Sequence, residues 1–375
     1  MHIGFDITSL VFQRGVSRYT GNLVRSLLAA GTEVSLLGYS MRKKSLLDQF
    51  VASIKPKSLI HSSIYPLSPN LVNFTWQYFG WPNPVQSLPG MQLFHSWDWQ
   101  QPPHMQIPLI STIHDVAILK YPETAHPLVK KRHEQSWSTL KKRQARLIAV
   151  SQATKRDLVE LLGYPSYLIH VVHEALPEEF RQLTNGITEE EEQMVIQKLN
   201  LSKPFVLFVG TREPRKNLAR LIEAWRPLAS DFQLIVAGES GWDGVSEQQH
   251  TDQLRFLGRV TDTELSVLYG QASCFAYPSL YEGFGLPILE SFHHGTAVIT
   301  SDNSGMREVA GNAAELIDPI SVESIRKGLT TVLSESIPDQ QKRLQRMIIR
   351  QQMFSWDRVA HETLAVYKQA LSEIQ

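Results

Sequence analysis

The chain has 375 residues, which favours two domains, and its 37 Lys and Arg residues balance 37 Asp and Glu residues to a formal net charge of zero. This balance argues against general nucleic-acid binding, which needs a basic excess, and no run approaches the roughly 18 apolar residues of a membrane span. The N-terminus, Met-His-Ile-Gly-Phe-Asp, predicts a strand rather than a signal peptide, and the single cysteine, Cys274, fits a reducing compartment. We therefore expect a cytoplasmic protein.

The first stretch of the chain predicts a βαβ unit. Residues 2–6 form a strand, a loop passes Gly15, a helix with one apolar face spans 19–28, and residues 33–39 form the next strand. Such units build parallel sheets with ligands at the carboxyl ends of the strands. The loop lacks a Gly-x-Gly-x-x-Gly fingerprint; Gly15 either lets a ligand approach the backbone or simply makes a turn.

Residues 41–91 are broken by prolines and carry an aromatic cluster. Its members are Phe74, Trp76, Tyr78, Phe79 and Trp81. Core packing is the commoner fate of such residues; the alternative is a lip for an acceptor molecule, because flat rings pack well on sugars and lipid-like groups.

Strands are predicted again at 92–95 and 109–113, and His114 follows the second of them directly. No second ligand stands at metal spacing around His114, so a zinc site is not expected. A helix rich in Lys and Arg is predicted for 126–146, either as a solvated surface or as a surface that contacts anionic lipid. Ser151 then caps a helix that Gly163 ends, before a strand at 167–172.

The composition shifts at 177–200, which is polar and acidic and predicts an interdomain connection with a charged helix. A second βαβ series follows, with a strand at 205–209, a loop at 210–217 and a helix at 218–228 that Asn217 is expected to cap. Further strands are predicted at 233–237, 255–257, 274–277, 297–300 and 314–317. Thr261 and Glu264 have the spacing of a capping box.

The loop 210–217 holds three cations, Arg212, Arg215 and Lys216, before a helix N-terminus that already favours negative charge. A bound phosphate or diphosphate explains them best; a solvated charge run is the alternative. The loop after the strand 274–277 holds Glu282, and Glu290 is expected in the first turn of the helix that Pro287 begins. These carboxylates either stay solvated and complement the helix dipole, or bind the hydroxyls of a ribose and a sugar.

Glu282 and Glu290 enclose seven residues, and this Glu-x7-Glu spacing resembles the signature of the retaining family 4 glycosyltransferases (GT4). Glu-Pro-Arg-Lys-Asn at 213–217 is similar to the phosphate-binding loop of that family. Other segments also fall where members have matching ones: Ile113-His114-Asp115, Val150-Ser151-x-x-Thr154, Gly258-Arg259-Val260 and Phe354-Ser355-Trp356. The resemblance covers the whole chain and is strongest from residue 205 to 310.

The resemblance implies an α/β protein of the GT-B fold, with two doubly wound Rossmann-like domains facing a central cleft. Residues 1–176 would form an acceptor-binding domain, and residues 177–356 a domain that binds the nucleotide sugar. The C-terminal helix, 357–375, would cross back onto the first domain. We expect the two domains to close over the donor.

The resemblance also implies roles for single residues. Arg215 and Lys216 would bind the donor diphosphate and stabilise the leaving phosphate, while Glu282 would hold the transferred sugar. His114 would touch that sugar near the reacting carbon, which completes the catalytic set. The other donor-binding residues would be Gly15 near the phosphates, Val260 at the base, Glu290 at the ribose, Arg212, and the backbone of Gly283, Phe284, Gly285 and Leu286.

Many members have Gly-Arg where this chain has Gly210-Thr211, so the role of Arg212 is open. Acceptor contacts are expected from Trp97, Asp98 and Trp99.

The implied reaction needs neither metal nor another cofactor. A diphosphate leaves while an acceptor hydroxyl attacks the same face, so the configuration at the sugar is retained. The donor is expected to be a GDP- or UDP-linked sugar, with mannose from GDP-mannose first, because Thr-x-His-Asp and Glu-Pro-Arg-Lys-Asn together resemble mannosyltransferase-like members. The acceptor would be a glycan or a lipid-linked saccharide. Alternatives are glucose or N-acetylglucosamine from UDP donors, an NAD-dependent oxidoreductase without the usual fingerprint, and an inactive donor-binding partner subunit.

Overall fold

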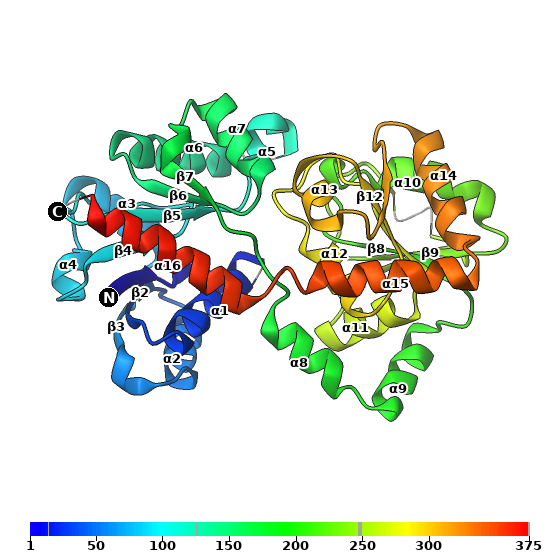
Figure 1. Cartoon of the computed structure of the whole chain (residues 1–375), viewed down its shortest axis with the longest axis horizontal. Coiled ribbons are helices and arrows are strands. Elements are labelled where there is room, and N and C mark those ends of the chain that lie inside the picture. Colours follow the sequence, from blue (N-terminus) through cyan, green and yellow to red (C-terminus); the bar gives the residue numbers. More distant parts are fainter. Residues whose placement is uncertain (14, 125–126, 247–249, 374–375) are drawn as a thin grey trace. The chain divides into compact units, whose positions relative to one another are not determined.

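The computed structural model describes residues 1–13, 15–124, 127–246 and 250–373, which divide into two compact units (Figure 1). The first unit comprises Met1–Pro177 and the segment from Ser355 onward, and the second comprises Glu178–Phe354. Each unit is built on a single sheet in which every pair of neighbouring strands is parallel.

The first unit has seven strands in the order β3-β2-β1-β4-β5-β6-β7. They are β1 (His2–Asp6), β2 (Glu33–Tyr39), β3 (Ile60–Tyr65), β4 (Leu93–Ser96), β5 (Leu109–Ile113), β6 (Arg146–Ala149) and β7 (Ile169–Val171). The helices are α1 (Gly15–Ala29), α2 (Lys44–Ser53), α3 (Pro69–Tyr78), α4 (Pro84–Ser87), α5 (Ala117–Lys120), α6 (Pro127–Lys142), α7 (Gln152–Leu162) and α16 (Trp356–Ser372). On one face of this sheet, apolar residues of α3, α6 and α7 form a common core with the strands.

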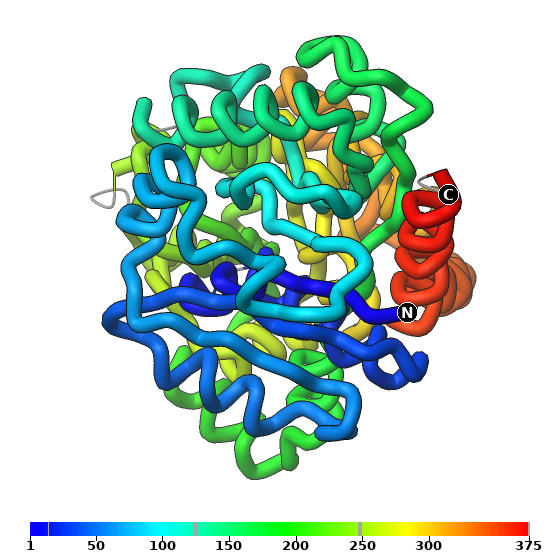
Figure 2. The backbone as a smooth tube through the Cα atoms, turned by 90° about the vertical axis from the view of Figure 1, so that its left-hand side faces the viewer, coloured from blue at the N-terminus to red at the C-terminus, as the bar shows by residue number. Residues whose placement is uncertain are grey.

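The segment from Ser355 onward is an integral part of the first unit. Helix α16, red in Figures 1 and 2, lies beside α1, and the rings of Tyr19 and Trp356 are 5.8 Å apart. The Tyr367 hydroxyl lies 2.6 Å from His95 Nδ1 in β4, and Trp356 Nε1 donates to the Leu176 carbonyl over 2.9 Å. The predicted helix 357–375 is thus present as α16, while its last two residues lie outside the described part of the chain.

The second unit has six strands in the order β10-β9-β8-β11-β12-β13. They are β8 (Phe205–Val209), β9 (Gln233–Ala237), β10 (Leu254–Gly258), β11 (Cys274–Tyr277), β12 (Val298–Ser301) and β13 (Glu315–Ile317). The helices are α8 (Glu178–Gly186), α9 (Glu189–Leu199), α10 (Leu218–Trp225), α11 (Asp262–Gln271), α12 (Leu286–His293), α13 (Ser304–Ala310), α14 (Val322–Leu333) and α15 (Ile337–Gln351). Apolar residues of α10 and α14 form the core on one face.

Local capping signals work as predicted at three helix ends. Ser151 accepts a hydrogen bond from the Thr154 backbone N–H, and α7 ends at Gly163 with φ at 57°. Thr261 and Glu264 form the predicted capping box at the start of α11. These signals depend on short-range hydrogen bonds, so the sequence alone determines them.

Two predictions in the first unit were wrong, and one region without a prediction proved to be structured. The region 41–91, to which the sequence assigned no element, contains the strand β3. The segment 10–17 is largely helical, because a 3-10 helix (Thr8–Phe12) precedes α1, and Arg14 between them lies outside the described residues. Of the aromatic cluster only Trp76 is buried. Phe74 and Tyr78 are exposed because α3 turns only one side to the core, and Phe79 and Trp81, which follow the helix, are exposed as well.

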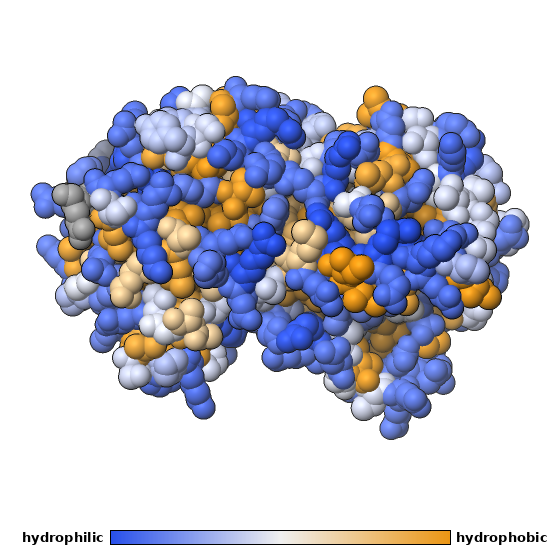
Figure 3. Space-filling view, viewed as in Figure 1, coloured by the Kyte–Doolittle hydropathy of each residue, from blue (hydrophilic) through white to orange (hydrophobic). Residues whose placement is uncertain are grey.

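The basic helix predicted for 126–146 is shorter than expected. Helix α6 ends at Lys142, and Arg146 belongs to β6; His126, where the predicted helix begins, lies outside the described residues. Within the described ranges, no helix is both long and apolar enough to cross a membrane. Polar residues make up most of the face shown in Figure 3, with apolar residues scattered among them.

Candidate active site

Both sheets reverse the direction of their strand order at one place. In the first unit this place lies between β1 and β4, and in the second between β8 and β11. Ligands of open parallel α/β sheets bind at such a switch point, beyond the carboxyl ends of the strands. The segments that follow β4, β8 and β11 carry most of the predicted site residues.

Two cations and one carboxylate form a cluster after β8 and β11. The Glu282 carboxylate lies 2.7 Å from an Arg215 guanidinium nitrogen and 2.7 Å from Lys216 Nζ. Lys216 Nζ also donates to the Tyr277 hydroxyl over 3.0 Å. The pairing of β8 with β11 brings these residues together, although Lys216 and Glu282 stand 66 residues apart in the chain.

Burial and neighbouring charge act in opposite directions on Glu282. Burial alone would raise the pKa of this carboxyl, but Arg215 and Lys216 outweigh it and lower the pKa to about 2. Burial, followed by the charge of Glu282, raises the pKa of Tyr277 well above its usual value, so its hydroxyl stays protonated. The two cations are therefore held by an ionised carboxylate, and a bound anion would compete with Glu282 for them.

Close backbone packing fixes the loop between β11 and α12. The Gly305 N–H donates to the Glu282 carbonyl over 3.1 Å. A Cβ atom at Gly305 would lie 2.2 Å from the Gly283 carbonyl oxygen, so only glycine allows this approach. Gly285, with φ at 120°, precedes α12, and Pro287 lies in its first turn as predicted. The Glu282 carboxylate is thus mounted on a rigid loop.

Glu290 does not lie in the first turn of α12 as predicted, but further along the helix. Its carboxylate is buried and accepts a hydrogen bond of 2.9 Å from the Tyr269 hydroxyl. Because the dipole effect falls off within the first turn, complementing the dipole does not account for this carboxylate. The predicted contact of Glu290 with a ribose remains a prediction.

The remaining residues of this loop offer their backbone rather than their side chains. The Phe284 ring is buried 5.6 Å from the Phe354 ring, and Gly283 and Gly285 have no side chain. Donor contacts of Gly283 to Leu286 therefore concern backbone atoms, as the sequence prediction stated. These contacts remain predictions.

The prediction that the Asn217 side chain caps α10 was wrong. Asn217 has φ at 64° and makes no side-chain cap, because an N-cap residue needs an extended backbone. Its side-chain amide donates instead to the carbonyls of Pro278, over 3.0 Å, and Pro319, over 2.7 Å. Asn217 therefore ties the cationic loop to the loop after β11.

Arg212 has contacts of its own, directed away from Glu282. Its buried guanidinium donates to Ser240 Oγ over 2.9 Å and lies 5.0 Å from the centroid of the Phe256 ring. A Cβ atom at Gly241 would lie 2.0 Å from the Arg212 carbonyl oxygen, so the segment after β9 packs tightly on this residue. Val260 follows β10 and is half-buried. Donor contacts of Arg212 and Val260 remain predictions.

In the first unit, His114 follows β5 and pairs with a carboxylate that the sequence analysis missed. His114 Nδ1 lies 2.6 Å from the Glu174 carboxylate, and Nε2 has no partner among the described residues. Burial would lower the pKa of His114, but the hydrogen bond and charge of Glu174 outweigh it and raise the pKa. Glu174 therefore orients the imidazole and favours its protonated form. The predicted contact of His114 with the donor sugar remains a prediction.

One aromatic ring, that of Tyr19, packs directly on His114. The Tyr19 ring meets the His114 ring edge to face at 4.8 Å, and the Tyr19 hydroxyl lies 3.2 Å from Thr112 Oγ1. His95 shares that Thr112 hydroxyl at 3.0 Å, and burial, followed by the charge of His114, lowers the pKa of His95 to about 3. His95 is therefore neutral, and its two ring nitrogens are occupied by Tyr367 and Thr112.

Trp97, Asp98 and Trp99 follow β4 at the switch point of the first sheet. The two indole rings are stacked with centroids 5.8 Å apart and planes 7° from parallel, and Phe12 stacks on Trp97 at 5.5 Å. Asp98 is buried, and burial raises its pKa even though His133 and His114 act to lower it. One Asp98 carboxylate oxygen has no hydrogen-bond partner among the described residues. An acceptor contact at these residues remains a prediction.

Gly15 is the first residue of α1 and is exposed. A Cβ atom placed there would meet no atom within 4 Å, and the backbone of Gly15 is not among the positive-φ positions. No turn therefore requires glycine here, which removes one of the two explanations for this residue. Close approach of a ligand remains a prediction.

Within residues 1–13, 15–124, 127–246 and 250–373, no three or more His, Cys, Asp or Glu side chains are grouped to hold a metal ion. Sequence reasoning missed Glu174, Tyr277 and Tyr269 as members of these clusters. Glu174 follows β7 as His114 follows β5, so the rule that singled out His114 would also have found it. Tyr277 and Tyr269 gave no such signal, because buried tyrosines normally belong to the core.

Two family models match consecutive parts of the chain. Residues 13–180 match the model described as Glycosyltransferase Family 4, and residues 189–351 match Glycosyl transferases group 1. The chain is 31% identical over 281 residues to the O-antigen chain mannosyltransferase B of Escherichia coli, which covers 71% of each protein. It is also 28% identical over 227 residues to the serotype-specific mannosyltransferase WbdA of E. coli, covering 57% of this chain but only 28% of WbdA.

Solved structures share the fold across nearly the whole length. A glycosyltransferase from Rickettsia africae has a TM-score of 0.72 and 16% identity, covering 99% of this chain and 98% of that one. Anabaena HepE in complex with UDP and glucose has a TM-score of 0.69 and 17% identity, covering 98% of this chain and 100% of that one. With its two parallel-sheet units, the chain has the GT-B fold and belongs to glycosyltransferase family 4.

Proposed function

We propose that this glycosyltransferase moves a hexose from a nucleotide-diphosphate sugar to a hydroxyl group of a glycan or lipid-linked saccharide. The observation that carries the proposal is the buried cluster of Glu282, Arg215 and Lys216 at the switch point of the second sheet. Arg215 and Lys216 suit a diphosphate, and Glu282 suits a sugar hydroxyl.

Competition between the donor diphosphate and Glu282 for the two cations determines the order in which the parts of the donor are bound. In the structure Glu282 occupies both cations, so a diphosphate that binds Arg215 and Lys216 weakens their hold on this carboxylate. Glu282 can then accept hydrogen bonds from hydroxyl groups of the sugar. Binding of the donor phosphate thus prepares the group that orients the donor sugar.

The proposed chemistry is a same-face substitution. The bond between the sugar and the diphosphate breaks, the acceptor oxygen bonds to the same carbon from the same side, and the acceptor proton passes to the departing phosphate. Arg215 and Lys216 stabilise the charge that develops on the leaving group, and His114 Nε2 contacts the donor sugar. The configuration at the sugar is retained, and the residues named here need no metal ion.

Mannose from GDP-mannose is the proposed donor. Two relatives at 31% and 28% identity carry the name mannosyltransferase, which supports this choice. UDP-glucose or UDP-N-acetylglucosamine is the second candidate, because HepE, which shares the fold, was solved with UDP and glucose. Membership of the glycosyltransferase family leaves no support for the oxidoreductase alternative.

A donor panel tests the proposal. GDP-mannose should raise the thermal midpoint of the protein more than UDP-glucose or UDP-N-acetylglucosamine, and NAD should leave it unchanged. Transfer to a saccharide acceptor, followed by NMR of the product, should show the anomeric configuration of the donor. If only a UDP sugar shifts the thermal midpoint, that sugar replaces GDP-mannose as the proposed donor. A product of inverted configuration would exclude the retaining mechanism. Donor binding without transfer would favour a donor-binding subunit.

A further inference from the structure

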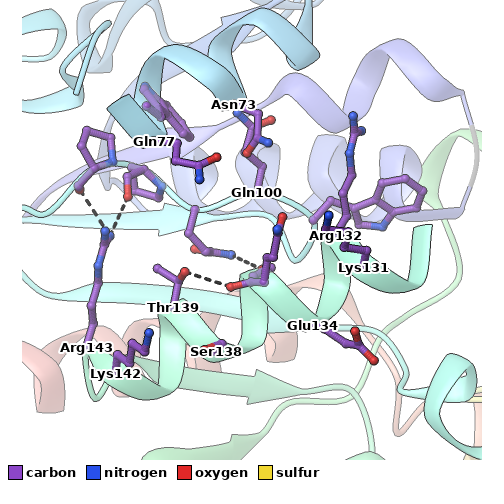
Figure 4. Close-up of a pocket in the computed structure, with 17 residues that line it drawn as sticks. Asn73, Gln77, Gln100, Lys131, Arg132, Glu134, Ser138, Thr139, Lys142 and Arg143 are labelled. Carbon is purple, nitrogen blue, oxygen red and sulfur yellow. Dashed lines mark hydrogen bonds between the residues drawn. The ribbon is translucent and has the colours of Figure 1, made fainter. Parts of the chain in front are cut away.

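A pocket of about 550 Å³ lies in the first unit between α3, the segment 99–103 and α6 (Figure 4). Five side-chain amides line it, from Asn73, Gln77, Gln100, Gln101 and Gln135. Trp99 also lines it, and this ring is stacked on Trp97. Amides beside an aromatic ring are the groups that bind sugar hydroxyls and sugar faces.

The pocket carries a positive charge that the whole chain lacks. Its lining has four cations, Lys131, Arg132, Lys142 and Arg143, against one carboxylate, Glu134. In Figure 4, Lys131 and Arg132 lie at one end of the pocket and Lys142 and Arg143 at the other. Neither Lys131 nor Lys142 has an ion pair among the described residues. Both ends therefore suit an anionic group.

Several contacts hold this lining in place before any ligand arrives. The Arg132 guanidinium contacts Asn70 of α3, and Arg143 donates to the Pro102 carbonyl over 2.6 Å. Gln101 donates to Ser136 Oγ over 2.9 Å. Gln100 is only 6% exposed, and its side-chain nitrogen has no hydrogen-bond partner among the described residues. A buried donor of this kind points to a ligand that supplies an acceptor.

Exposed aromatic residues lie on α3 and directly after it. We call Phe74 and Tyr78 of α3, with Phe79 and Trp81 after the helix, the aromatic face; their side chains are 52%, 63%, 72% and 51% exposed, in that order. The rings of Phe74 and Tyr78 lie 4.9 Å apart, and Phe79 lies 6.1 Å from Phe74. Asn73 and Gln77 form one row of α3, and Phe74 and Tyr78 form the next. Exposed aromatic rings grouped in this way mark a lipid or partner surface.

We propose that the pocket and the aromatic face together bind one amphiphile, a saccharide joined through phosphate to a hydrocarbon lipid. The cations bind the phosphate, the amides bind the sugar hydroxyls, and the aromatic face lies in the lipid surface. The role of this amphiphile as glycosyl acceptor rests on the proposed function; its binding does not. The pocket adjoins the predicted acceptor residues, because Trp99 lines it and is stacked on Trp97.

Vesicle flotation without donor tests the binding. The probes are phosphatidylcholine vesicles alone, with phosphatidylglycerol, or with a polyprenyl diphosphate-linked monosaccharide. The protein should bind the last at least tenfold more tightly than the other two. Tyr78→Ser with Phe79→Ser, and separately Lys131→Glu with Lys142→Glu, should each remove that gain. Trp242→Ser and Lys327→Glu, exposed positions of the second unit, serve as controls and should retain it.

The outcomes separate this proposal from the proposed function. Loss of binding in the Lys131 and Lys142 variant but not in the Tyr78 and Phe79 variant would overturn the lipid component. Equal binding to phosphatidylglycerol vesicles would identify a general membrane contact and overturn the saccharide assignment. A donor melting shift with no vesicle binding overturns only this proposal, whereas vesicle binding with no donor shift and no transfer overturns only the proposed function.

Discussion

The two switch points of this molecule are built in different ways. After β8 and β11, Glu282 pairs with two cations, and each of the three charges is matched inside the second unit. After β4 in the first unit, buried polar atoms of Trp97, Asp98 and Gln100 have no hydrogen-bond partner among the described residues. The charges of the Glu282 cluster are thus paired without a ligand, although Ser279 Oγ after β11 is also buried with no hydrogen-bond partner among the described residues; the segment after β4 has three such side chains close together in the chain.

This difference indicates what each region needs. An unsatisfied buried polar group costs about 1–3 kcal/mol, so several of them together indicate a place where a ligand or ordered water supplies the missing partners. A matched charge cluster instead needs an anion strong enough to compete with its own carboxylate. Stability and activity of the second unit should therefore depend most on its paired charges. Those of the first unit should depend most on the side chains that hold its buried polar groups in place. Four predictions test this contrast.

Removing the Glu282 carboxylate should have the largest effect on stability. Glu282→Ala leaves Lys216 without its carboxylate and Arg215 with the longer carboxylate contact to Glu213 at 3.3 Å, which should reduce the free energy of unfolding by about 3–5 kcal/mol. Urea unfolding followed by circular dichroism measures this. Glu223→Ala, which removes an exposed carboxylate of α10, is the matched control and should stay within about 0.5 kcal/mol of the parent. Equal effects of the two changes would show that the cluster carries no stability.

Removing the Lys216 ammonium should reduce transfer with little change in acceptor affinity. Lys216→Ala takes away one group that stabilises the departing phosphate, so kcat should fall by roughly 10²–10³. Steady-state kinetics with saturating donor measures this. Lys327→Ala, an exposed lysine of α14, should keep the parent rate. An unchanged kcat in the Lys216 variant would exclude it from the catalytic set.

The Glu282 cluster should also weaken in acid. The pKa of this carboxyl is about 2 in the folded protein against 4.5 ordinarily. Its contribution to the free energy of unfolding is therefore present above about pH 4.5 and is lost as the pH falls toward 2. The shift in pKa corresponds to about 3 kcal/mol of stability. Urea unfolding of the parent and of Glu282→Gln should show that the difference between their free energies of unfolding becomes smaller from about pH 7 to about pH 3. A constant difference would contradict the assigned pKa.

Neutralising Glu174 should have the smallest effect and should act through His114. In Glu174→Gln the pKa of His114 should fall, because the hydrogen bond and charge that raise it are weakened. The stability that comes from this raised pKa is present below the ordinary pKa of histidine and is lost as the pH rises through the pKa of His114 in the folded protein. The variant should lack this pH dependence of stability. NMR titration of the imidazole measures the shift. Glu160→Gln, an exposed position of α7, should leave the titration unchanged, and equal titrations in both variants would remove Glu174 as the partner.

Sequence reasoning succeeded where the signal was local. The bounds of β8, β9 and β11 were predicted to the residue, because short apolar runs between turn residues determine strands. It was wrong for Asn217, whose left-handed backbone is imposed by the loop that it ties down. It was also wrong for the aromatic face, because composition cannot say which side of α3 meets the core.

The site could be predicted as residues but not as a cluster. Arg215, Lys216 and Glu282 were each singled out, but two strands, β9 and β10, separate β8 from β11 in chain order, and the three residues were assigned to different parts of a ligand. Only the sheet order makes those two strands neighbours and brings the side chains into contact. His114 was found, but the pairing with Glu174 depends on the position of β7 relative to β5, which no local pattern contains.

The contribution of α16 to the first unit constrains how the chain acquires its structure during synthesis. The second unit is one continuous segment and can complete its fold once residue 354 has left the ribosome. The first unit cannot, because Tyr367, which lies fully buried against His95, is translated after all of the second unit. The half of the enzyme that is made first is therefore the last to be finished, and until then its uncovered sheet face needs protection from aggregation.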